Sequence, residues 1–104
     1  MDEGDVMRLT DYEQSAIRDE TASCFGSSAK VFLFGSRVND KSRGGDIDIL
    51  IKLGQSLMDA FSRKVRFLVN LKSKIGDQHI DVVVANPNDD RDVVRIDEEQ
   101  GVQL

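Results

Sequence analysis

Two short segments that alternate charged with branched apolar residues constrain this chain most. Residues 46–53 read DIDILIKL, and residues 79–85 read HIDVVVA. Because side chains alternate across a β-strand, Asp46 and Asp48 share one face of the first segment and its isoleucines share the other. Asp81 has the same phase in the second segment. We therefore expect two strands whose apolar faces pack on helices and whose three carboxylates emerge on one side of a sheet.

The first third of the chain predicts a helix followed by a strand. Residues 10–24 fit a helix with Thr10 as N-cap and Glu13 completing a capping box. Its expected inner face is formed by Tyr12, Ala16 and Ile17. Residues 30–34, KVFLF, are β-branched and aromatic and predict a buried strand that ends at Gly35. The polar residues 37–45 then predict a loop.

The second half of the chain predicts a long helix, a strand and a short helix. Residues 56–75 have helical apolar periodicity, with Ser56 as cap, Asp59 at the box position and Gly76 as the end. The expected core stripe of this helix is Leu57, Phe61, Val65, Leu68 and Ile75. After the strand at 79–85, residues 89–100 suggest a short helix, and GVQL suggests an edge strand. The order helix, strand, strand, helix, strand, helix predicts an α/β fold, with a small mixed β-sheet packed on helices.

Length and composition limit the class of protein. A chain of 104 residues predicts a single domain spanning residues 1–104. The net charge of −5 argues against direct, sequence-independent binding of nucleic acid, for which clustered positive charge is needed. Cys24 is the only cysteine, which excludes an internal disulfide, and we interpret it as a small buried hydrophobic residue. With no signal peptide and no membrane-length apolar run, we expect a cytoplasmic protein.

If the two strands are neighbours, their three carboxylates need a partner. Neighbouring strands lie about 4.8 Å apart, and like charges at that range repel each other. Divalent cations that prefer oxygen ligands neutralise such a cluster, and Mg²⁺ leaves positions open for substrate phosphates. Asp46, Asp48 and Asp81 are therefore candidate ligands for two Mg²⁺ ions, the arrangement that serves in-line displacement at phosphorus. The alternative is an acidic, solvated sheet face without function.

The turn after the first strand supplies a candidate phosphate site. Gly35 leaves the backbone accessible, and the Ser36 hydroxyl adds a polar group beside exposed N–H groups. Arg37 and Arg43, in the following loop, are candidates for fork-shaped contacts with phosphate.

The combination of GS at the end of a strand, a nine-residue loop and DID in the next strand resembles the nucleotidyltransferase superfamily that includes DNA polymerase beta. The short length and the wording GSR…GGDIDILI are similar to its smallest branch, the minimal nucleotidyltransferases (MNT). The resemblance implies a polymerase beta-like fold, Gly35 and Ser36 as the phosphate-binding pair, and Asp46 and Asp48 as metal ligands. It implies Asp81 as third carboxylate, a metal ligand or base near the acceptor hydroxyl, with ATP as substrate.

The same resemblance implies a cellular role. Small members of the family are commonly antitoxins paired with an all-helical HEPN ribonuclease toxin, and some transfer AMP from ATP to a tyrosine of that partner. Two further readings remain open at this point. The chain is either a non-catalytic antitoxin that neutralises its toxin by direct binding, or one subunit of a split nucleotidyltransferase. An oligomer or hetero-oligomer is also open, since a small sheet with an edge strand invites pairing.

Overall fold

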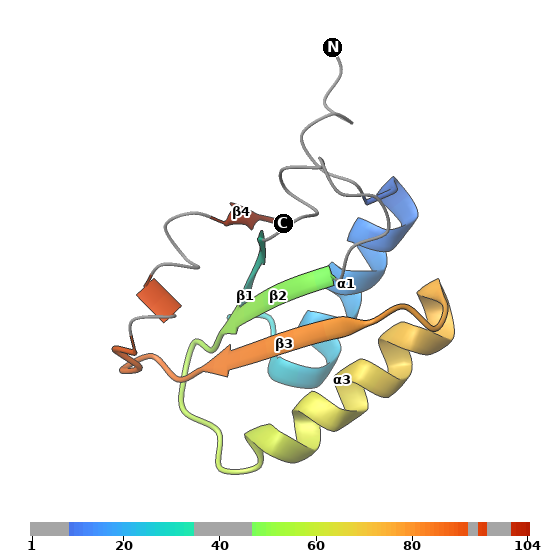
Figure 1. The fold of residues 1–104 in the computed structure, drawn as a ribbon. Coiled ribbons are helices and arrows are strands. Elements are labelled where there is room, and N and C mark those ends of the chain that lie inside the picture. The colour runs from blue at the N-terminus through green and yellow to red at the C-terminus, as the bar shows by residue number, and fades with distance from the viewer. Residues whose placement is uncertain (1–8, 35–46, 92–93, 96–100) are drawn as a thin grey trace.

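The computed structural model describes residues 9–34, 47–91, 94–95 and 101–104. Within these residues the chain forms two longer helices and a sheet (Figure 1). In chain order the elements are α1 (Asp11–Phe25), β1 (Lys30–Phe34), β2 (Ile47–Lys52), α3 (Ala60–Ile75), β3 (Ile80–Ala85) and β4 (Val102–Gln103). The expected strands at 30–34, 46–53 and 79–85 are thus present within a residue of their predicted ends, apart from Asp46, which lies outside the described residues.

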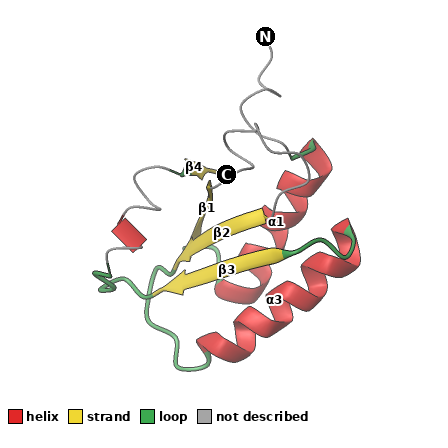
Figure 2. Ribbon diagram, in the orientation of Figure 1, coloured by secondary structure: helices red, strands yellow, loops and turns green. Residues whose placement is uncertain are grey.

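The sheet is mixed and has the strand order β3-β2-β1-β4. β1 pairs antiparallel with both β2 and β4, whereas β2 pairs parallel with β3. The parallel pair requires a crossover, and α3 provides it. Both α1 and α3 lie against the same face of the sheet (Figure 2). The expected α/β class is confirmed, and so is the expected edge strand near the C-terminal end of the sequence.

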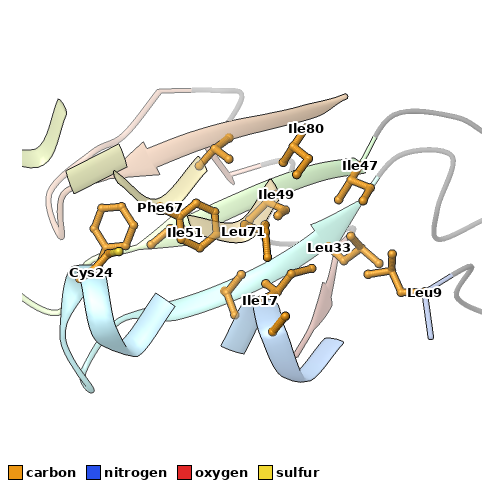
Figure 3. Packing of buried hydrophobic residues seen from close by; sticks show 14 of the residues in the cluster. Leu9, Ile17, Cys24, Leu33, Ile47, Ile49, Ile51, Phe67, Leu71 and Ile80 are labelled. Atoms are coloured by element: carbon orange, nitrogen blue, oxygen red, sulfur yellow. The ribbon is translucent and has the colours of Figure 1, made fainter. Parts of the chain in front are cut away.

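The main core fills the space between the helices and the sheet. Ile47, Ile49 and Ile51 of β2 are fully buried and point toward Ile17 of α1 and toward α3 (Figure 3). The remaining buried members of this core are Leu9, Ala16, Cys24, Phe25, Val31, Leu33, Leu53, Phe67, Leu71, Ile80 and Val82. Burying branched side chains of this size stabilises the fold by about 1.5–3 kcal/mol each, which fixes the face that β2 turns to the helices.

A second, smaller apolar cluster covers the middle of the opposite face. Phe32, Leu50 and Ala85 of three neighbouring strands are buried there beneath Val94, with Val83 packed at the side. Phe32 and Leu50 are direct register partners, as are Leu50 and Val83. The segment after β3 therefore returns across the sheet and supplies the cover of this face.

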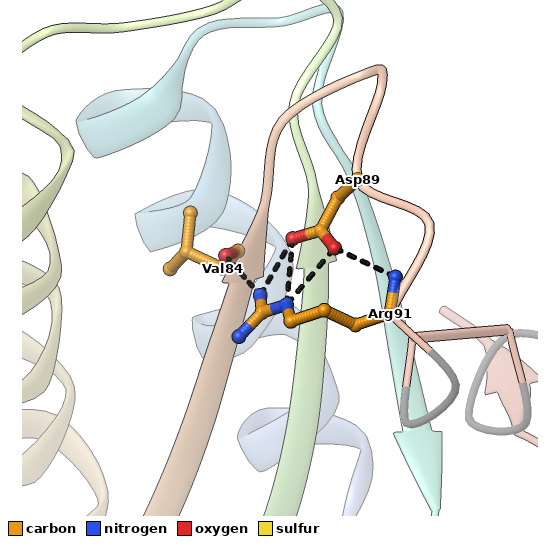
Figure 4. Close-up of polar contacts among 3 residues, drawn as sticks. All are labelled: Val84, Asp89 and Arg91. Atoms are coloured by element: carbon orange, nitrogen blue, oxygen red, sulfur yellow. Dashed lines mark hydrogen bonds and ion pairs between the residues drawn. The ribbon is translucent and has the colours of Figure 1, made fainter.

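An ion pair holds the chain where it leaves β3. The Arg91 guanidinium contacts both carboxylate oxygens of Asp89, at 2.6 to 3.0 Å, and donates to the Val84 carbonyl at 3.4 Å (Figure 4). This fork-shaped contact lowers the pKa of Asp89 from its ordinary value. Because β3 is an edge strand, the guanidinium also provides a hydrogen bond to a carbonyl on the outer edge of β3.

The first helix begins as the sequence predicts. The Thr10 hydroxyl accepts from the Glu13 amide and the Glu13 carboxylate accepts from the Thr10 amide, both at 3.0 Å, so the capping box is present. The expectation that Tyr12 faces inward is wrong, because its side chain is 61% exposed. At 3.6 residues per turn, Tyr12 lies about 140° around the helix from the buried Ile17. The two residues cannot share one inner face.

The second helix departs further from the prediction. It begins at Ala60 and not near Ser56, and Asp59 makes no capping hydrogen bond because its carboxylate binds Arg63 Nε at 2.7 Å. The helix does end at Gly76, whose φ of 97° suits glycine. The expected core positions Phe61 and Val65 are wrong: both side chains are exposed, and Phe67 and Leu71 form the buried stripe instead. Leu57, Leu68 and Ile75 are partly buried at its margin.

Polar contacts tie the two helices together in antiparallel orientation. The buried Glu20 carboxylate accepts from Asn70 Nδ2 at 3.2 Å and pairs with Lys74 Nζ at 2.7 Å. Near the other end, Arg63 Nη1 donates to the Cys24 carbonyl at 2.9 Å. The hydrogen bond with Lys74 lowers the pKa of Glu20, and burial opposes that shift.

Among the described residues, no helix has the length and apolar character needed to cross a membrane.

The ion pair between Glu20 and Lys74 predicts a contribution to the stability of the fold that is lost in acid. We expect Glu20→Gln to lower the free energy of unfolding at neutral pH by about 1–2 kcal/mol, since Lys74 is partly exposed and water screens the lost charge. The folded-state pKa of Glu20 lies below its ordinary value of 4.5, so its charge stabilises the fold above that pH. The contribution disappears as the pH falls through the folded-state pKa. Urea unfolding at a series of pH values should show the difference between wild type and variant shrinking on acidification.

The control is Asp90→Asn, which removes the same charge from an exposed position after β3. It should change the free energy of unfolding little at any pH. A difference between Glu20→Gln and wild type that stayed constant down to strongly acidic pH would contradict the assignment.

Candidate active site

Asp48 and Asp81 meet at one end of the sheet. In the parallel register of β2 and β3 the two residues are direct partners. Their neighbours in sequence, Ile47, Ile49, Ile80 and Val82, are buried on the helix side. Because side chains alternate, both carboxylates point to the opposite side. The sheet thus places two of the three predicted acids side by side, near the starts of both strands.

A backbone hydrogen bond and a side-chain contact define this end of the sheet further. The Ile47 amide donates to the His79 carbonyl at 3.0 Å, which joins the chain entering β2 to the chain entering β3. The His79 ring lies beside Asp81, with Nε2 at 3.6 Å from Oδ1. The backbone contact fixes the relative positions of the two strand starts, and therefore of Asp48 and Asp81.

The carboxylate pair is open to water. Asp48 is half-buried, and the Asp81 side chain is 58% exposed. Two residues further along the strands, Leu50 and Val83 belong to the covered apolar cluster. Two charges about 5 Å apart repel by about 1 kcal/mol in water and about 3 kcal/mol at an effective dielectric constant of 20. This repulsion opposes folding, and a cation at this position would remove it.

The remaining predicted site residues lie outside the described part of the chain. These are Gly35, Ser36, Arg37, Arg43 and Asp46. β1 ends at Phe34, the register partner of Asp48, so the chain leaves the described sheet toward Gly35 from a position opposite Asp48. Asp46 directly precedes Ile47 in the sequence. The roles assigned to these residues, and to Asp48 and Asp81, stay predictions.

The described donor set suits a magnesium ion. Asp48 and Asp81 offer carboxylate oxygens, the ligands that Mg²⁺ prefers, and Mg²⁺ commonly binds through only one or two carboxylates. In the described residues no group of three or more acidic, histidine or cysteine side chains is placed to hold a metal. The third predicted ligand, Asp46, lies outside the described residues.

Two other residues bear on the chemistry. The sequence places His79 in the same strand phase as Asp81, which allows it to approach the site, but a histidine at a strand start is most often a surface residue, so the predicted site does not include it. Its contact with Asp81 makes it part of this end of the sheet.

Cys24 is buried as predicted, and burial raises the pKa of its thiol. A buried thiol with a raised pKa is a poor nucleophile, which fits a core residue.

The family comparison now identifies the class of protein. The model of the family described as "Nucleotidyltransferase domain" matches residues 15–104, which include all the described strands. The chain therefore belongs to the nucleotidyltransferase domain family, and its general reaction class is nucleotidyl transfer. A comparison with individual curated proteins finds no significant match.

If Asp48 and Asp81 bind a divalent cation, the cation should stabilise the fold. A ligand present at ten times its dissociation constant adds about 1.4 kcal/mol to the free energy of unfolding. We expect the melting temperature to rise with MgCl₂ at constant ionic strength. The rise should be lost in Asp48→Asn and kept in Asp90→Asn. An equal rise in wild type and Asp48→Asn would show that magnesium binds elsewhere.

Proposed function

We propose that this chain transfers AMP from ATP to a hydroxyl group, with release of pyrophosphate. The observation that carries the proposal is the direct register partnership of Asp48 and Asp81 on the open side of the sheet. The family match supports the reaction class. The AMP donor, the acceptor and the metal are parts of the proposal.

In this proposal each residue has a defined task. Gly35 and Ser36 hold the terminal phosphates of ATP through backbone N–H groups and a hydroxyl, and Arg37 and Arg43 add charge-assisted contacts. The acceptor oxygen forms a bond to the α-phosphorus while the bond to the bridging oxygen of pyrophosphate breaks. The Asp81 carboxylate accepts the proton of the acceptor hydroxyl.

Magnesium is the metal that these residues fit. Asp46 and Asp48, together with Asp81, would hold it through carboxylate oxygens. When bound, it would neutralise phosphate charge and lower the pKa of the acceptor hydroxyl. Arginine, serine and backbone N–H groups would orient the triphosphate independently of it. His79, at 3.6 Å from Asp81 Oδ1, is placed to orient that carboxylate.

We further propose that the acceptor is a tyrosine of a HEPN toxin, so that the chain acts as an antitoxin. The exposed position of Asp81 supports an acceptor as large as a protein, because such an acceptor cannot enter an enclosed cavity. The partner would bring its own hydroxyl to the sheet face. A cytoplasmic location belongs to the same proposal.

The test is co-expression of this chain with the product of an adjacent gene that encodes an all-helical protein, followed by intact mass spectrometry of that product. We expect the mass increment of AMP with wild type and with Asp90→Asn. Asp48→Asn should abolish the increment and restore toxicity, since one carboxylate of the pair is lost. Far-UV circular dichroism should confirm that the variant is folded.

The contrary outcome is equally defined. If Asp48→Asn still neutralises the partner, and no mass increment occurs with either form, the chain is a non-catalytic antitoxin that acts by binding. Transfer of AMP that survives Asp48→Asn would place the chemistry at another site.

A further inference from the structure

The outer face of α3 carries an apolar stripe that the fold leaves uncovered. Phe61, Val65 and Val69 follow each other at intervals of four residues, so they lie along one side of the helix. Their side chains are 77%, 45% and 62% exposed, and Met58 in the preceding turn is fully exposed. Among the described residues, only Tyr12 is another large apolar residue with comparable exposure. Contiguous exposed apolar residues of this kind mark interaction surfaces.

Positive charge surrounds this stripe. α3 contains Arg63, Lys64, Arg66, Lys72 and Lys74 and no acidic residue, although the chain as a whole has a net charge of −5. Arg63 and Lys74 pair with Asp59 and Glu20. At 3.6 residues per turn, Lys64 and Arg66 flank Val65 on its two sides, and Lys72 lies close to the line of the stripe. The surface is therefore apolar in the middle and basic at its rim.

A shallow groove continues the stripe toward the sheet edge. It has a volume of about 290 Å³, and its walls come from α3, from β3 and from Arg91. Phe61 belongs both to the stripe and to the groove, and Lys64 stands on the groove wall. β3 is an edge strand, so no further strand closes this side of the groove in the described chain. The stripe and groove together form one continuous surface, which we call the α3 face.

We infer that the α3 face docks an α-helical protein partner whose contact surface has an apolar ridge flanked by Asp and Glu. A straight stripe at four-residue spacing matches the ridge of a second helix, as in helix packing and helix-in-groove recognition. The basic rim matches carboxylates, which set the orientation of the partner and speed the encounter. The basic rim of the α3 face therefore favours a partner whose contact surface carries acidic side chains.

Charge also disfavours two other occupants. A second copy docked symmetrically through α3 would place against each other two helices whose charged side chains are all basic. An anionic membrane would be repelled by the net charge of −5 of the chain as a whole.

The inference does not depend on the proposed AMP transfer. The α3 face lies on the helix side of the sheet, whereas Asp48 and Asp81 emerge on the other side. A partner docked on α3 would leave the carboxylate pair accessible. Substitutions on the α3 face therefore test docking without touching the candidate active site.

The experiment uses two synthetic helical peptides as probes. Both carry the same leucine ridge at four-residue spacing, flanked in one by glutamates and in the other by lysines. Fluorescence anisotropy with the full chain should show binding of the glutamate peptide about tenfold or more tighter than the lysine peptide, with affinity that falls as salt rises. Equal affinities for both peptides would overturn the inference.

Matched variants locate the binding. Phe61→Ser combined with Val69→Ser, and separately Lys64→Glu combined with Lys72→Glu, should each weaken binding of the glutamate peptide about tenfold or more. Phe61 and Val69 are exposed and Lys64 and Lys72 are half-buried, so circular dichroism checks that the fold is kept. Tyr12→Ser, and Arg18→Glu combined with Lys30→Glu, make the same changes at other exposed positions and should have little effect. Equal losses in the control variants would overturn the inference.

Two further measurements examine the disfavoured occupants. Sedimentation velocity that shows a dimer in wild type and a monomer in Phe61→Ser/Val69→Ser would assign the α3 face to a second copy and overturn the inference. Co-sedimentation with phosphatidylserine vesicles, in the absence of any peptide binding, would assign it to a membrane and also overturn it.

Discussion

The parallel pairing of β2 with β3 is the constraint on which the rest of the structure depends. It puts Ile47 opposite Ile80 and Asp48 opposite Asp81, so one face of the pair is apolar throughout and the other begins with two carboxylates. A shift of one residue in either strand would bury a carboxylate under the helices and expose a branched side chain. The same burial that stabilises the core therefore holds the two acids together, against their mutual repulsion.

The two faces of the sheet differ in what covers them. On one side α1 and α3 bury the isoleucine face completely, and the Glu20 contacts hold the helices to each other. On the other side, within the described part of the chain, Val94 covers the middle, around Leu50 and Phe32. No described residue of this cluster covers the strand starts, where Asp48 and Asp81 lie. This division separates a candidate site on the open face from a docking surface on the outer side of α3.

The alternation of apolar and acidic residues along the strands allowed the two faces of the sheet to be predicted from the sequence. The alternation in DIDILI and HIDVVV has only one way to bury its apolar face, so the faces of Asp48 and Asp81 followed directly. The Thr10–Glu13 capping box was also predicted, because its two hydrogen bonds are local. Sequence does not fix which strands become neighbours, so the pairing of these two strands was a condition of the predicted site, and the structure meets it.

The buried face of the helix α3 was harder to predict from the sequence than the buried faces of the strands. α3 has apolar residues around most of its circumference, so Phe61 and Val65 fitted a helical stripe as well as Phe67 and Leu71 did. Only the position of α1 and the sheet decides which stripe is buried. The helix start was also misplaced: Ser56 was the expected cap, whereas the helix begins at Ala60 and the Asp59 carboxylate binds Arg63. The error in α3 is informative, since Phe61 and Val65, which were wrongly assigned to the core, belong to the exposed α3 face.

The most direct test of the central claim is a crystal structure of the chain with Mn²⁺ and a non-hydrolysable ATP analogue. Anomalous scattering would locate manganese, which takes the same oxygen ligands as magnesium. The account predicts an anomalous peak within bonding distance of carboxylate oxygens of both Asp48 and Asp81, with the triphosphate bound beside it. A triphosphate and metal bound elsewhere, with these two carboxylates facing only solvent, would contradict it.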